Sequence, residues 1–261
     1  MLAAHGVSFA YDRGAPLVLD GVSLSIERGG IVGLIGPNGS GKTTMLRLLS
    51  GTLKPASGRV TLDGADVGAL SRRHLARRIA VVPQDTHSAF DFTALEIVLM
   101  GRYPHLSAFE LEGATDLSIA RDALAATGTI GLEARPFATL SGGEKQRVVI
   151  ASALAQASDV LLLDEPTASL DPGFQLEIAA LLLRLNRERG VTMAVSTHDL
   201  NLAATLCSDL VLLKGGRAIA AGATRDVLTR ENVRILYGVD ADVADHPRAG
   251  HLIVVPLARV E

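Results

Sequence analysis

The sequence contains eight consecutive residues with the types and spacing of a phosphate-binding loop, Gly36-Pro37-Asn38-Gly39-Ser40-Gly41-Lys42-Thr43. The apolar segment 30–35 before them favours a buried strand, and the segment 44–49 after them favours a helix. Glycines let backbone N–H groups approach an anion, because a Cβ atom would block that approach or strain φ. The helix start adds partial positive charge, Lys42 adds a full charge, and Thr43 offers a hydroxyl ligand to Mg²⁺. The loop predicts a nucleoside triphosphate site; a glycine turn that only caps a helix is the weaker alternative.

Two adjacent carboxylates, Asp164 and Glu165, follow the apolar segment 159–163, which is predicted to be a buried strand. Burying two carboxylates costs free energy unless they bind a ligand. Asp164 suits a Mg²⁺ ion, held directly or through water, and Glu165 suits the role of orienting and polarising an attacking water. A plain acid pair at a helix start before Pro166 is the structural alternative.

Two further polar side chains stand where other predicted strands end. Gln84 follows a strand predicted over 79–82, and His198 follows one predicted over 191–196. Ligands gather at the carboxyl ends of strands in open parallel sheets. On spacing alone, Gln84 is better explained as a loop residue that caps its strand. His198 shares the predicted sheet edge with the carboxylates, which favours it as a γ-phosphate sensor.

The segment 140–144, Leu-Ser-Gly-Gly-Glu, is predicted to open a helix. Its Ser141 and Glu144 have the spacing of a capping box. The glycine pair between them is unusual, because glycine in a first turn costs stability unless backbone N–H groups there must approach an anion. The loop at 36–43 already provides one triphosphate cradle. The second anion site therefore predicts either a second ligand or one shared across a dimer.

Length and composition limit the function classes. The 261 residues suit one large α/β domain, or a core with an inserted lobe. With 28 acidic and 25 basic residues the net charge is −3, which argues against a nucleic-acid partner. The single cysteine, Cys207, excludes an internal disulfide and fits a reducing cytoplasm. No apolar run reaches the ~18–20 residues of a membrane span, and the N-terminus lacks a signal segment, so we expect any membrane role to come through a partner.

Strand patterns dominate the N-terminal part of the chain, over residues 2–11, 17–26 and 58–62. Tyr11, at the end of the first of these, fits two interpretations equally: a platform that stacks on an adenine ring, or a half-exposed strand tyrosine.

Residues 85–157 carry several helical patterns and no convincing strand, which predicts a helical lobe inserted into the α/β core. Thr93 and Glu96 have capping-box spacing, and a second helix is predicted over 112–126. The aromatic residues where the lobe begins fit either an ordinary core or an apolar patch for a partner: Phe90, Phe92 and Tyr103.

After the carboxylates, the segment Ser169-Leu170-Asp171-Pro172 predicts a helix start with Asp171 as its cap. Strands are expected over 210–213, 217–221 and 252–255, with helices from Thr224 and Arg230. Five acidic and histidine side chains near the end match no metal-ligand spacing and are expected in a solvated turn: Asp240, Asp242, Asp245, His246 and His251.

The order of these motifs resembles the nucleotide-binding subunit of ABC transporters over nearly the whole chain. The motifs that carry it are Gly36–Thr43, Gln84, Leu140–Gln146, Val160–Glu165, Ser169-Leu170-Asp171 and His198. The segment 140–146 is the most specific, since other phosphate-loop families lack it; Glu144 departs from the glutamine of many members, and its capping role still holds.

The resemblance implies the α/β fold of P-loop NTPases of the ABC ATPase type. This fold has a mixed, largely parallel sheet flanked by helices, an N-terminal antiparallel β portion and an inserted α-helical lobe. It implies one nucleotide-binding domain over residues 1–261. Its parts would be an α/β core over 1–84 and 158–230, the lobe over 85–157, and a C-terminal extension over 231–261.

The resemblance also implies an ATPase that uses ATP and Mg²⁺. Glu165 would be the general base, His198 would hold the γ-phosphate, and Gln84 would contact Mg²⁺ and the membrane partner. Thr43 and Asp164 would be further Mg²⁺ ligands. Residues that would contact ATP are Tyr11 (on adenine), Gly36, Pro37, Asn38, Gly39, Ser40, Gly41, Lys42, Thr43, Thr44, Ser141, Gly142, Gly143 and Asp171. In a homodimer, each ATP would lie between 36–43 of one subunit and 141–143 of the other, with Asp171 acting across the dimer.

A narrower set of motifs resembles importers of iron-siderophore, haem or cobalamin: Phe92–Glu96, Met100–His105, Tyr237–Val239 and Val254–Pro256. The implied function is ATP-driven import through a membrane permease, on the cytoplasmic face of the inner membrane. A substrate-binding protein would be an indirect partner, and nucleic acid would not be one. The alternatives are the ATPase of another ABC transporter, including an exporter, and a soluble ABC ATPase scaffold. The segment 140–146 argues against a phosphate-loop kinase or GTPase.

Overall fold

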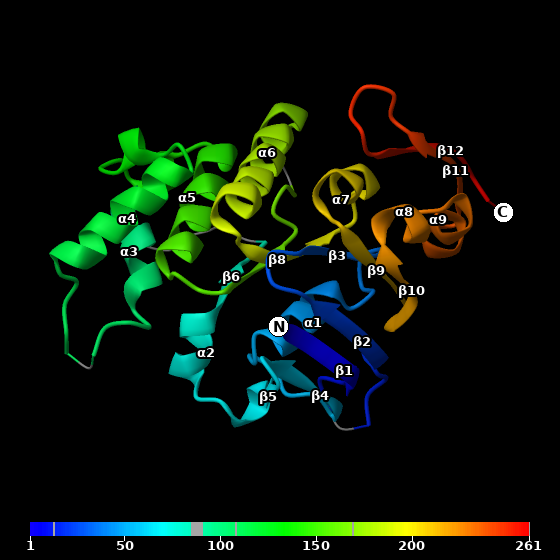
Figure 1. Ribbon diagram of the computed structural model, residues 1–261, viewed down its shortest axis with the longest axis horizontal. Helices are drawn as coiled ribbons and strands as arrows, with labels where there is room; N and C mark the ends of the chain where they lie inside the picture. The colour runs from blue at the N-terminus through cyan, green and yellow to red at the C-terminus, as the bar shows by residue number, and fades with distance from the viewer. Residues whose placement is uncertain (13, 85–90, 108, 169, 261) are drawn as a thin grey trace. The chain divides into compact units, whose positions relative to one another are not determined.

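The computed structural model describes residues 1–12, 14–84, 91–107, 109–168 and 170–260. The chain divides into two compact units (Figure 1). Unit 1 comprises Met1–Leu70 and Leu183–Glu261, and unit 2 comprises Ser71–Leu182. The long helix α6 (Pro172–Arg189) begins in unit 2 and ends in unit 1.

The N-terminal part of unit 1 is an antiparallel sheet in the order β2-β1-β4-β5. Its strands are β1 (Leu2–Phe9), β2 (Leu19–Ile26), β4 (Ser57–Leu62) and β5 (Ala65–Asp66). Along β2 buried and more exposed residues mostly alternate, as they do in a strand with one face on the core. The two N-terminal strands expected from the sequence and the strand at 58–62 are confirmed; the two-residue β5 was not expected.

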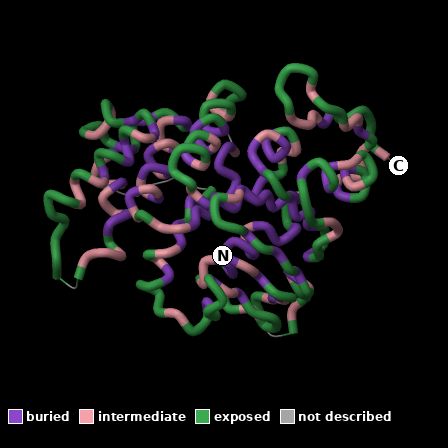
Figure 2. The backbone as a smooth tube through the Cα atoms, in the orientation of Figure 1, coloured by how far each residue is buried: buried purple, intermediate pink, exposed green. Residues whose placement is uncertain are grey.

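Unit 1 also contains neighbouring strands in the order β10-β9-β3-β8. They are β3 (Ile31–Ile35), β8 (Thr192–Thr197), β9 (Asp209–Lys214) and β10 (Arg217–Ala223). β3 pairs in parallel with β8 and β9, and β10 is antiparallel to β9, so the arrangement is mixed as expected. Every residue of β3 and β8 is buried (Figure 2), which fits the apolar sequence of β3 and of the middle of β8, Met193–Val195.

Cys207 lies in this core and is almost fully buried, beside Gly33 of β3: a Cβ atom on Gly33 would come within 2.9 Å of its sulfur. Burial raises the pKa of the Cys207 thiol to about 12, with a smaller contribution from the Asp209 carboxylate. The thiol is therefore protonated at neutral pH and packs as a small apolar side chain.

The helices of unit 1 are α1 (Lys42–Leu49), α7 (Leu200–Leu206), α8 (Thr224–Val227) and α9 (Arg230–Tyr237). A hairpin of β11 (Val239–Asp245) and β12 (Leu252–Arg259) ends the chain. The expectation of a solvated turn is wrong for Asp240, Asp242 and Asp245, which lie in β11, whereas His246 and His251 do lie in the connection between the two strands. Arg225 and Arg230 pair with Asp245 and Asp242, so the acidic side chains serve ion pairs along this strand.

Unit 2 contains α2 (Arg72–Arg78), the parallel strands β6 (Ile79–Val82) and β7 (Val160–Asp164), and a helical lobe. The lobe is built from α3 (Ala94–Leu99), α4 (Ala114–Ala126) and α5 (Gly142–Ala155), which pack together (Figure 1, green). Their core includes Val98, Leu124, Phe137 and Val148. The capping box of Thr93 and Glu96 is confirmed. Apart from one isolated bridge, the described residues 91–107 and 109–157 contain no strand, as expected.

The aromatic residues at the start of the lobe are only partly described. Phe90 lies outside the described residues, Phe92 is half-buried, and Tyr103 follows the short 3-10 helix Met100–Arg102 with an exposed side chain. The exposed Tyr103 does not belong to the core, and its contact with a partner stays a prediction.

An ion pair holds the lobe together. Arg102 Nε donates to Asp116 Oδ1 at 2.9 Å, and only 8% and 14% of these side chains are exposed. Arg102 also donates to the carbonyl of Ala155 at 2.7 Å, which ties α5 to the pair. The bond from Arg102, helped by the Gly113 N–H, holds the pKa of Asp116 below its usual range.

Asp116→Ala should therefore destabilise the protein by roughly 3 kcal/mol, because it leaves the Arg102 charge buried without its partner. Since the pKa of Asp116 is lowered by folding, the stabilisation is present above the ordinary carboxyl pKa of about 4 and is lost as pH falls through the lowered value. Urea unfolding at pH 7 and pH 3 measures both effects. Asp245→Ala, which breaks an exposed pair, is the control and should cost less than about 1 kcal/mol. Equal costs for the two variants would contradict the assignment.

Candidate functional site

The predicted phosphate loop runs from the end of β3 to the start of α1 in unit 1. Gly41 caps α1 with φ of 102°, a conformation that side chains other than glycine rarely adopt. At Gly36, a Cβ atom would lie 2.2 Å from the carbonyl oxygen of Leu213. The loop conformation therefore requires glycine at both positions, and the expected strand–loop–helix order is confirmed.

The loop is prepared for an anion. The Lys42 side chain is buried and its Nζ donates to the carbonyl of Gly36 at 2.8 Å, so the ammonium folds back over the loop. The buried Ser40 hydroxyl has no hydrogen-bond partner in the part of the chain that the structure describes. A loop with three glycines, a buried cation and an unsatisfied hydroxyl fits a phosphate group. Thr43, half-buried in the first turn of α1, provides the hydroxyl expected at a Mg²⁺ ligand position.

Tyr11 lies beside the start of α1. Its hydroxyl lies 3.1 Å from Thr44 Oγ1, and its ring meets Phe9 edge-on with centroids 5.0 Å apart. The residue is 54% exposed. It is therefore a half-exposed tyrosine next to the phosphate loop, and its stacking on adenine stays a prediction.

His198 reaches the edge of the sheet where the phosphate loop begins. β3 and β8 pair in parallel with Ile35 opposite Thr197, so Gly36 and His198 leave the two strands side by side. His198 is exposed, and Asp199 after it caps α7 by accepting from the N–H groups of Asn201 and Leu202. Within unit 1, the phosphate loop and His198 therefore start from one edge of the sheet, and the edge that His198 was expected to share with the carboxylates stays a prediction.

In unit 2 two parallel strands likewise end side by side, with polar residues directly after them. β6 and β7 pair in parallel with Val82 opposite Leu163, so Gln84 and the pair Asp164 and Glu165 leave these strands together. Both carboxylates are buried, whereas Gln84 is exposed. Glu165 has φ of 49°, in the left-handed region that non-glycine residues rarely adopt. Strain of this kind persists where the surroundings fix a residue, and it is concentrated at functional sites.

Ser141 is the cap of α5. Glu144 N–H donates to Ser141 Oγ at 3.3 Å, and Ser141 N–H donates to Glu144 Oε2 at 2.8 Å, which confirms the capping box. The bond from Ser141 N–H holds the pKa of Glu144 below its usual range. Glu144 thus stabilises the helix start as a carboxylate, and its difference from glutamine does not disturb the cap.

The glycine pair after Ser141 has a packing reason that the sequence did not reveal. A Cβ atom on Gly143 would lie 2.4 Å from the ring of Phe174, in the first turn of α6. At Gly142 it would meet only the end of the Leu170 side chain, at 3.3 Å. Phe174 N–H donates to Asp171 Oδ1 at 3.1 Å, so the expected cap at Asp171 is confirmed; Ser169 lies outside the described residues. The ring of Phe174 therefore fixes how the starts of α5 and α6 meet.

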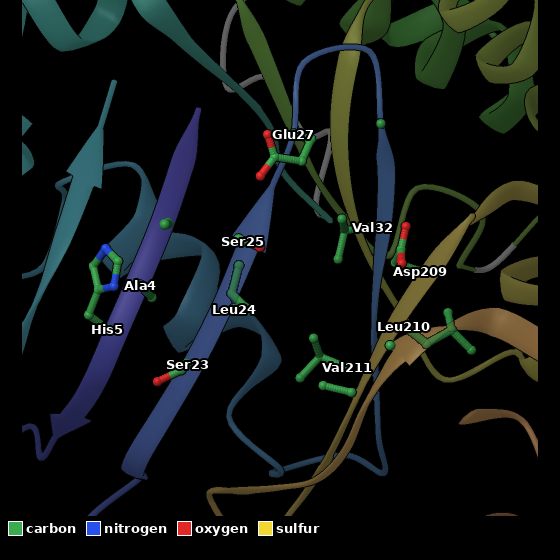
Figure 3. A pocket seen from close by; sticks show the side chains of 14 residues that line it. Ala4, His5, Ser23, Leu24, Ser25, Glu27, Val32, Asp209, Leu210 and Val211 are labelled. Carbon is green, nitrogen blue, oxygen red and sulfur yellow. The ribbon is translucent and has the colours of Figure 1, made fainter. Parts of the chain in front are cut away.

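A hollow of about 510 Å³ lies elsewhere in unit 1, between β1 and β2 on one side and β3 and β9 on the other (Figure 3). Its lining includes His5, Glu27 and Asp209 and contains none of the predicted site residues. The candidate site therefore consists of the strand ends and helix starts described above, each within its own unit.

Comparison with known proteins identifies relatives of the whole chain. The sequence model of the ABC transporter family matches residues 19–168. The hemin import ATP-binding protein HmuV of Bordetella pertussis is 44% identical, over 93% of this chain and 94% of that protein. The ferric enterobactin transport ATP-binding protein FepC of Escherichia coli is 40% identical over 98% of this chain and 94% of that protein.

A cobalamin import ATP-binding protein, BtuD of Halobacterium salinarum, is also 44% identical, over 92% of this chain. The chain spans only 60% of that relative's length. Among solved structures, a metal-chelate type ABC transporter in an inward-facing conformation matches with a TM-score of 0.86 and 30% identity, over 98% of this chain and 96% of the other. A dimeric bacterial ABC transporter cassette matches with a TM-score of 0.75 and 31% identity, over 86% and 99%.

Gly143→Ala should lower the free energy of unfolding by about 1–3 kcal/mol, because the new methyl group overlaps the Phe174 ring. The matched control is Gly142→Ala, whose methyl group meets only the movable end of the Leu170 side chain and should leave stability unchanged or raise it by up to about 1 kcal/mol through helix propensity. Adding Phe174→Leu to Gly143→Ala should recover part of the loss. Denaturant unfolding of the four chains measures this. Equal effects at the two glycines, without rescue, would remove the packing explanation.

Proposed function

The chain belongs to the ABC transporter family, and on that premise we propose that it is the ATP-hydrolysing subunit of an importer for a metal chelate. The observation that carries the proposal is the helix start at Ser141–Gly143, capped and free of side chains at its glycines, in a chain that has a separate phosphate loop at 36–43. A subunit with two helix N-termini that can bind anions fits a dimer in which each ATP molecule contacts both subunits.

ATP binding is assigned to the phosphate loop and its neighbours. Backbone N–H groups of the loop 36–44, in which Pro37 has none to donate, and the ammonium of Lys42 bind the phosphates, and Tyr11 stacks on the adenine ring. Thr43, Gln84 and Asp164 would hold Mg²⁺, which neutralises charge on the phosphates when bound. The buried Lys42 and the unsatisfied Ser40 hydroxyl support this assignment.

Hydrolysis is assigned to Glu165 and His198. Glu165 takes a proton from water, the water oxygen forms a bond to the γ-phosphorus, and the bond from that phosphorus to the β–γ bridging oxygen breaks. The products are ADP and inorganic phosphate. His198 donates a hydrogen bond to the γ-phosphate, where negative charge is redistributed during the transfer.

The working unit in this proposal is a homodimer with two ATP molecules. Each ATP lies between the loop 36–43 of one subunit and the helix start at Ser141–Gly143 of the other, and Asp171 acts across the dimer. ATP binding closes the dimer; hydrolysis and phosphate release open it. We assign residues 1–84 and 158–230 to the α/β core, 85–157 to the lobe, and 231–261 to a C-terminal extension.

Gln84 and the lobe at 85–157 pass this motion to a membrane permease, and a substrate-binding protein supplies the cargo to that permease. None of the helices in the described ranges is long and apolar enough to cross a membrane. We assign the subunit to the cytoplasmic face of the inner membrane, where it would bind its permease, as the resemblance to metal-chelate importers implies. The names of the hemin, enterobactin and cobalamin relatives support iron-siderophore, haem or cobalamin as the class of cargo.

Two substitutions separate ATP binding from chemistry. Glu165→Gln should keep ATP affinity and lower turnover on the order of 10²–10⁴-fold, because the amide cannot take the proton from water. Lys42→Ala should weaken ATP binding about 10–100-fold, because it removes a buried cation from the phosphate cradle. Calorimetric titration with ATP and a phosphate-release assay measure the two quantities. Unchanged turnover in Glu165→Gln excludes Glu165 as the base, and normal affinity in Lys42→Ala counts against the loop.

Affinity capture from the native membrane tests the transport role. We expect a polytopic permease of the metal-chelate type to co-purify with the subunit, because the chain itself supplies no membrane-crossing helix among its described residues. Lys42→Ala is the matched bait, and it should retain the permease since the substitution lies in the nucleotide site. Recovery of an exporter would overturn import, and recovery of no membrane protein would favour a soluble scaffold.

A further inference from the structure

A hydrogen bond ties the C-terminal extension to the backbone at His198. Tyr237, the last residue of α9, donates its hydroxyl to the carbonyl oxygen of His198 at 3.0 Å. His198 directly follows β8, and only Asp199 separates it from α7. The bond therefore joins the segment that presents the histidine to an element 39 residues later in the chain.

A second tie lies one turn further along. Asn201, at the start of α7, donates through Nδ2 to the carbonyl of Val254 at 3.1 Å and accepts through Oδ1 from the N–H of Val254 at 2.8 Å. The side-chain amide of Asn201 thus forms hydrogen bonds with both the N–H and the carbonyl of Val254, a buried residue of β12. A neighbouring strand would satisfy the same two backbone groups. The two ties fasten residues 198–201 to α9 and to the terminal hairpin.

Residues 198–201 are not closely packed on the side that faces α9 and the terminal hairpin. A hollow of about 320 Å³ lies against them, between α7, α9 and the hairpin. Its lining comprises His198, Asp199, Leu200, Asn201, Val233, Tyr237, Val239, Val254 and Pro256. On the side of this hollow few packed side chains hold the segment, so the hydrogen bonds from Tyr237 and Asn201 add to the restraint from the Asp199 N–H, which donates to Thr197 Oγ1 at 3.0 Å.

The helix α9, from which Tyr237 reaches the His198 carbonyl, is itself fixed by packing and by an ion pair. Val233 and Leu236 bury the inner face of α9, and Arg230 of α9 pairs with Asp242 of β11. After Tyr237, Gly238 ends the helix with φ of 67°, and its N–H donates to the carbonyl of Arg234 at 2.8 Å. Tyr237 is therefore a fixed point from which the backbone at His198 is held.

We propose that Tyr237 and Asn201 are positioning residues that set the backbone at His198, and that the C-terminal extension thereby tunes ATP hydrolysis. The proposal rests on the proposed function, in which His198 contacts the γ-phosphate. Neither Tyr237 nor Asn201 touches ATP; both act through the histidine. In the proposed mechanism the hydrogen bond from His198 strengthens as charge is redistributed on the γ-phosphate in the transition state, so loosening the histidine lowers turnover more than it lowers the affinity for ATP.

The test uses the full chain and measures kcat and KM for ATP hydrolysis with Mg²⁺. Tyr237→Phe, which removes one hydroxyl, should lower kcat about fivefold and change KM less than about twofold. Asn201→Ala should act in the same direction. Ile235→Val is the control, because it trims an exposed side chain on the same helix and should leave kcat unchanged. Circular dichroism and thermal unfolding establish that each variant is folded.

A double-mutant cycle separates positioning from a general structural effect. His198→Ala should lower kcat on the order of 100-fold, and adding Tyr237→Phe to it should cause no further loss. Wild-type kcat in Tyr237→Phe, or the same fivefold loss in the absence of the histidine, would overturn the proposal while leaving the ATPase assignment intact. An unmodified chain without ATPase activity would instead refute the proposed function, and this inference with it.

Discussion

The arrangement of the site depends on the register of short parallel strands buried on both faces. A slip of one residue between β3 and β8 would move every side chain of β8 to the opposite face, so the pairing of Ile35 with Thr197 is strongly specified. That pairing delivers Gly36 and His198 to one edge. The same logic in unit 2 pairs Val82 with Leu163 and delivers Gln84 and the carboxylates. The packing of the apolar strands thus determines where the polar residues of the candidate site lie.

Much of this could be predicted from the sequence because the signals are local. Strand, glycine turn and helix follow one another within the 19 residues 31–49, and the capping boxes at Thr93 and Ser141 each span four residues. Each signal involves residues whose spacing along the chain sets their distance in space. The family assignment, made from the order of such motifs, is confirmed by the family match over residues 19–168.

The features that were missed depend on contacts between distant segments. Nothing in the pattern around Gly143 points to Phe174, 31 positions later, although the ring is what excludes a side chain there. The acidic residues of β11 are poor strand formers, so the sequence predicts a turn there; the pairing of β11 with β12 and the ion pairs with arginines of α8 and α9 compensate for that preference. In the sequence, Tyr237 stands out only as part of a motif that resembles a group of importers. Its hydrogen bond to the His198 carbonyl can be recognised only in the folded structure.

The burial of Cys207 has a practical consequence for watching this protein move. Thiol-directed dyes react with the thiolate, and a side chain with its pKa raised to about 12 supplies almost none at neutral pH. We therefore expect the buried Cys207 to react only slowly with maleimide reagents in the folded chain, without any substitution in the core. A single cysteine placed on an exposed surface, such as that of α6 or of the terminal hairpin, can carry a fluorophore or spin label in an otherwise native subunit.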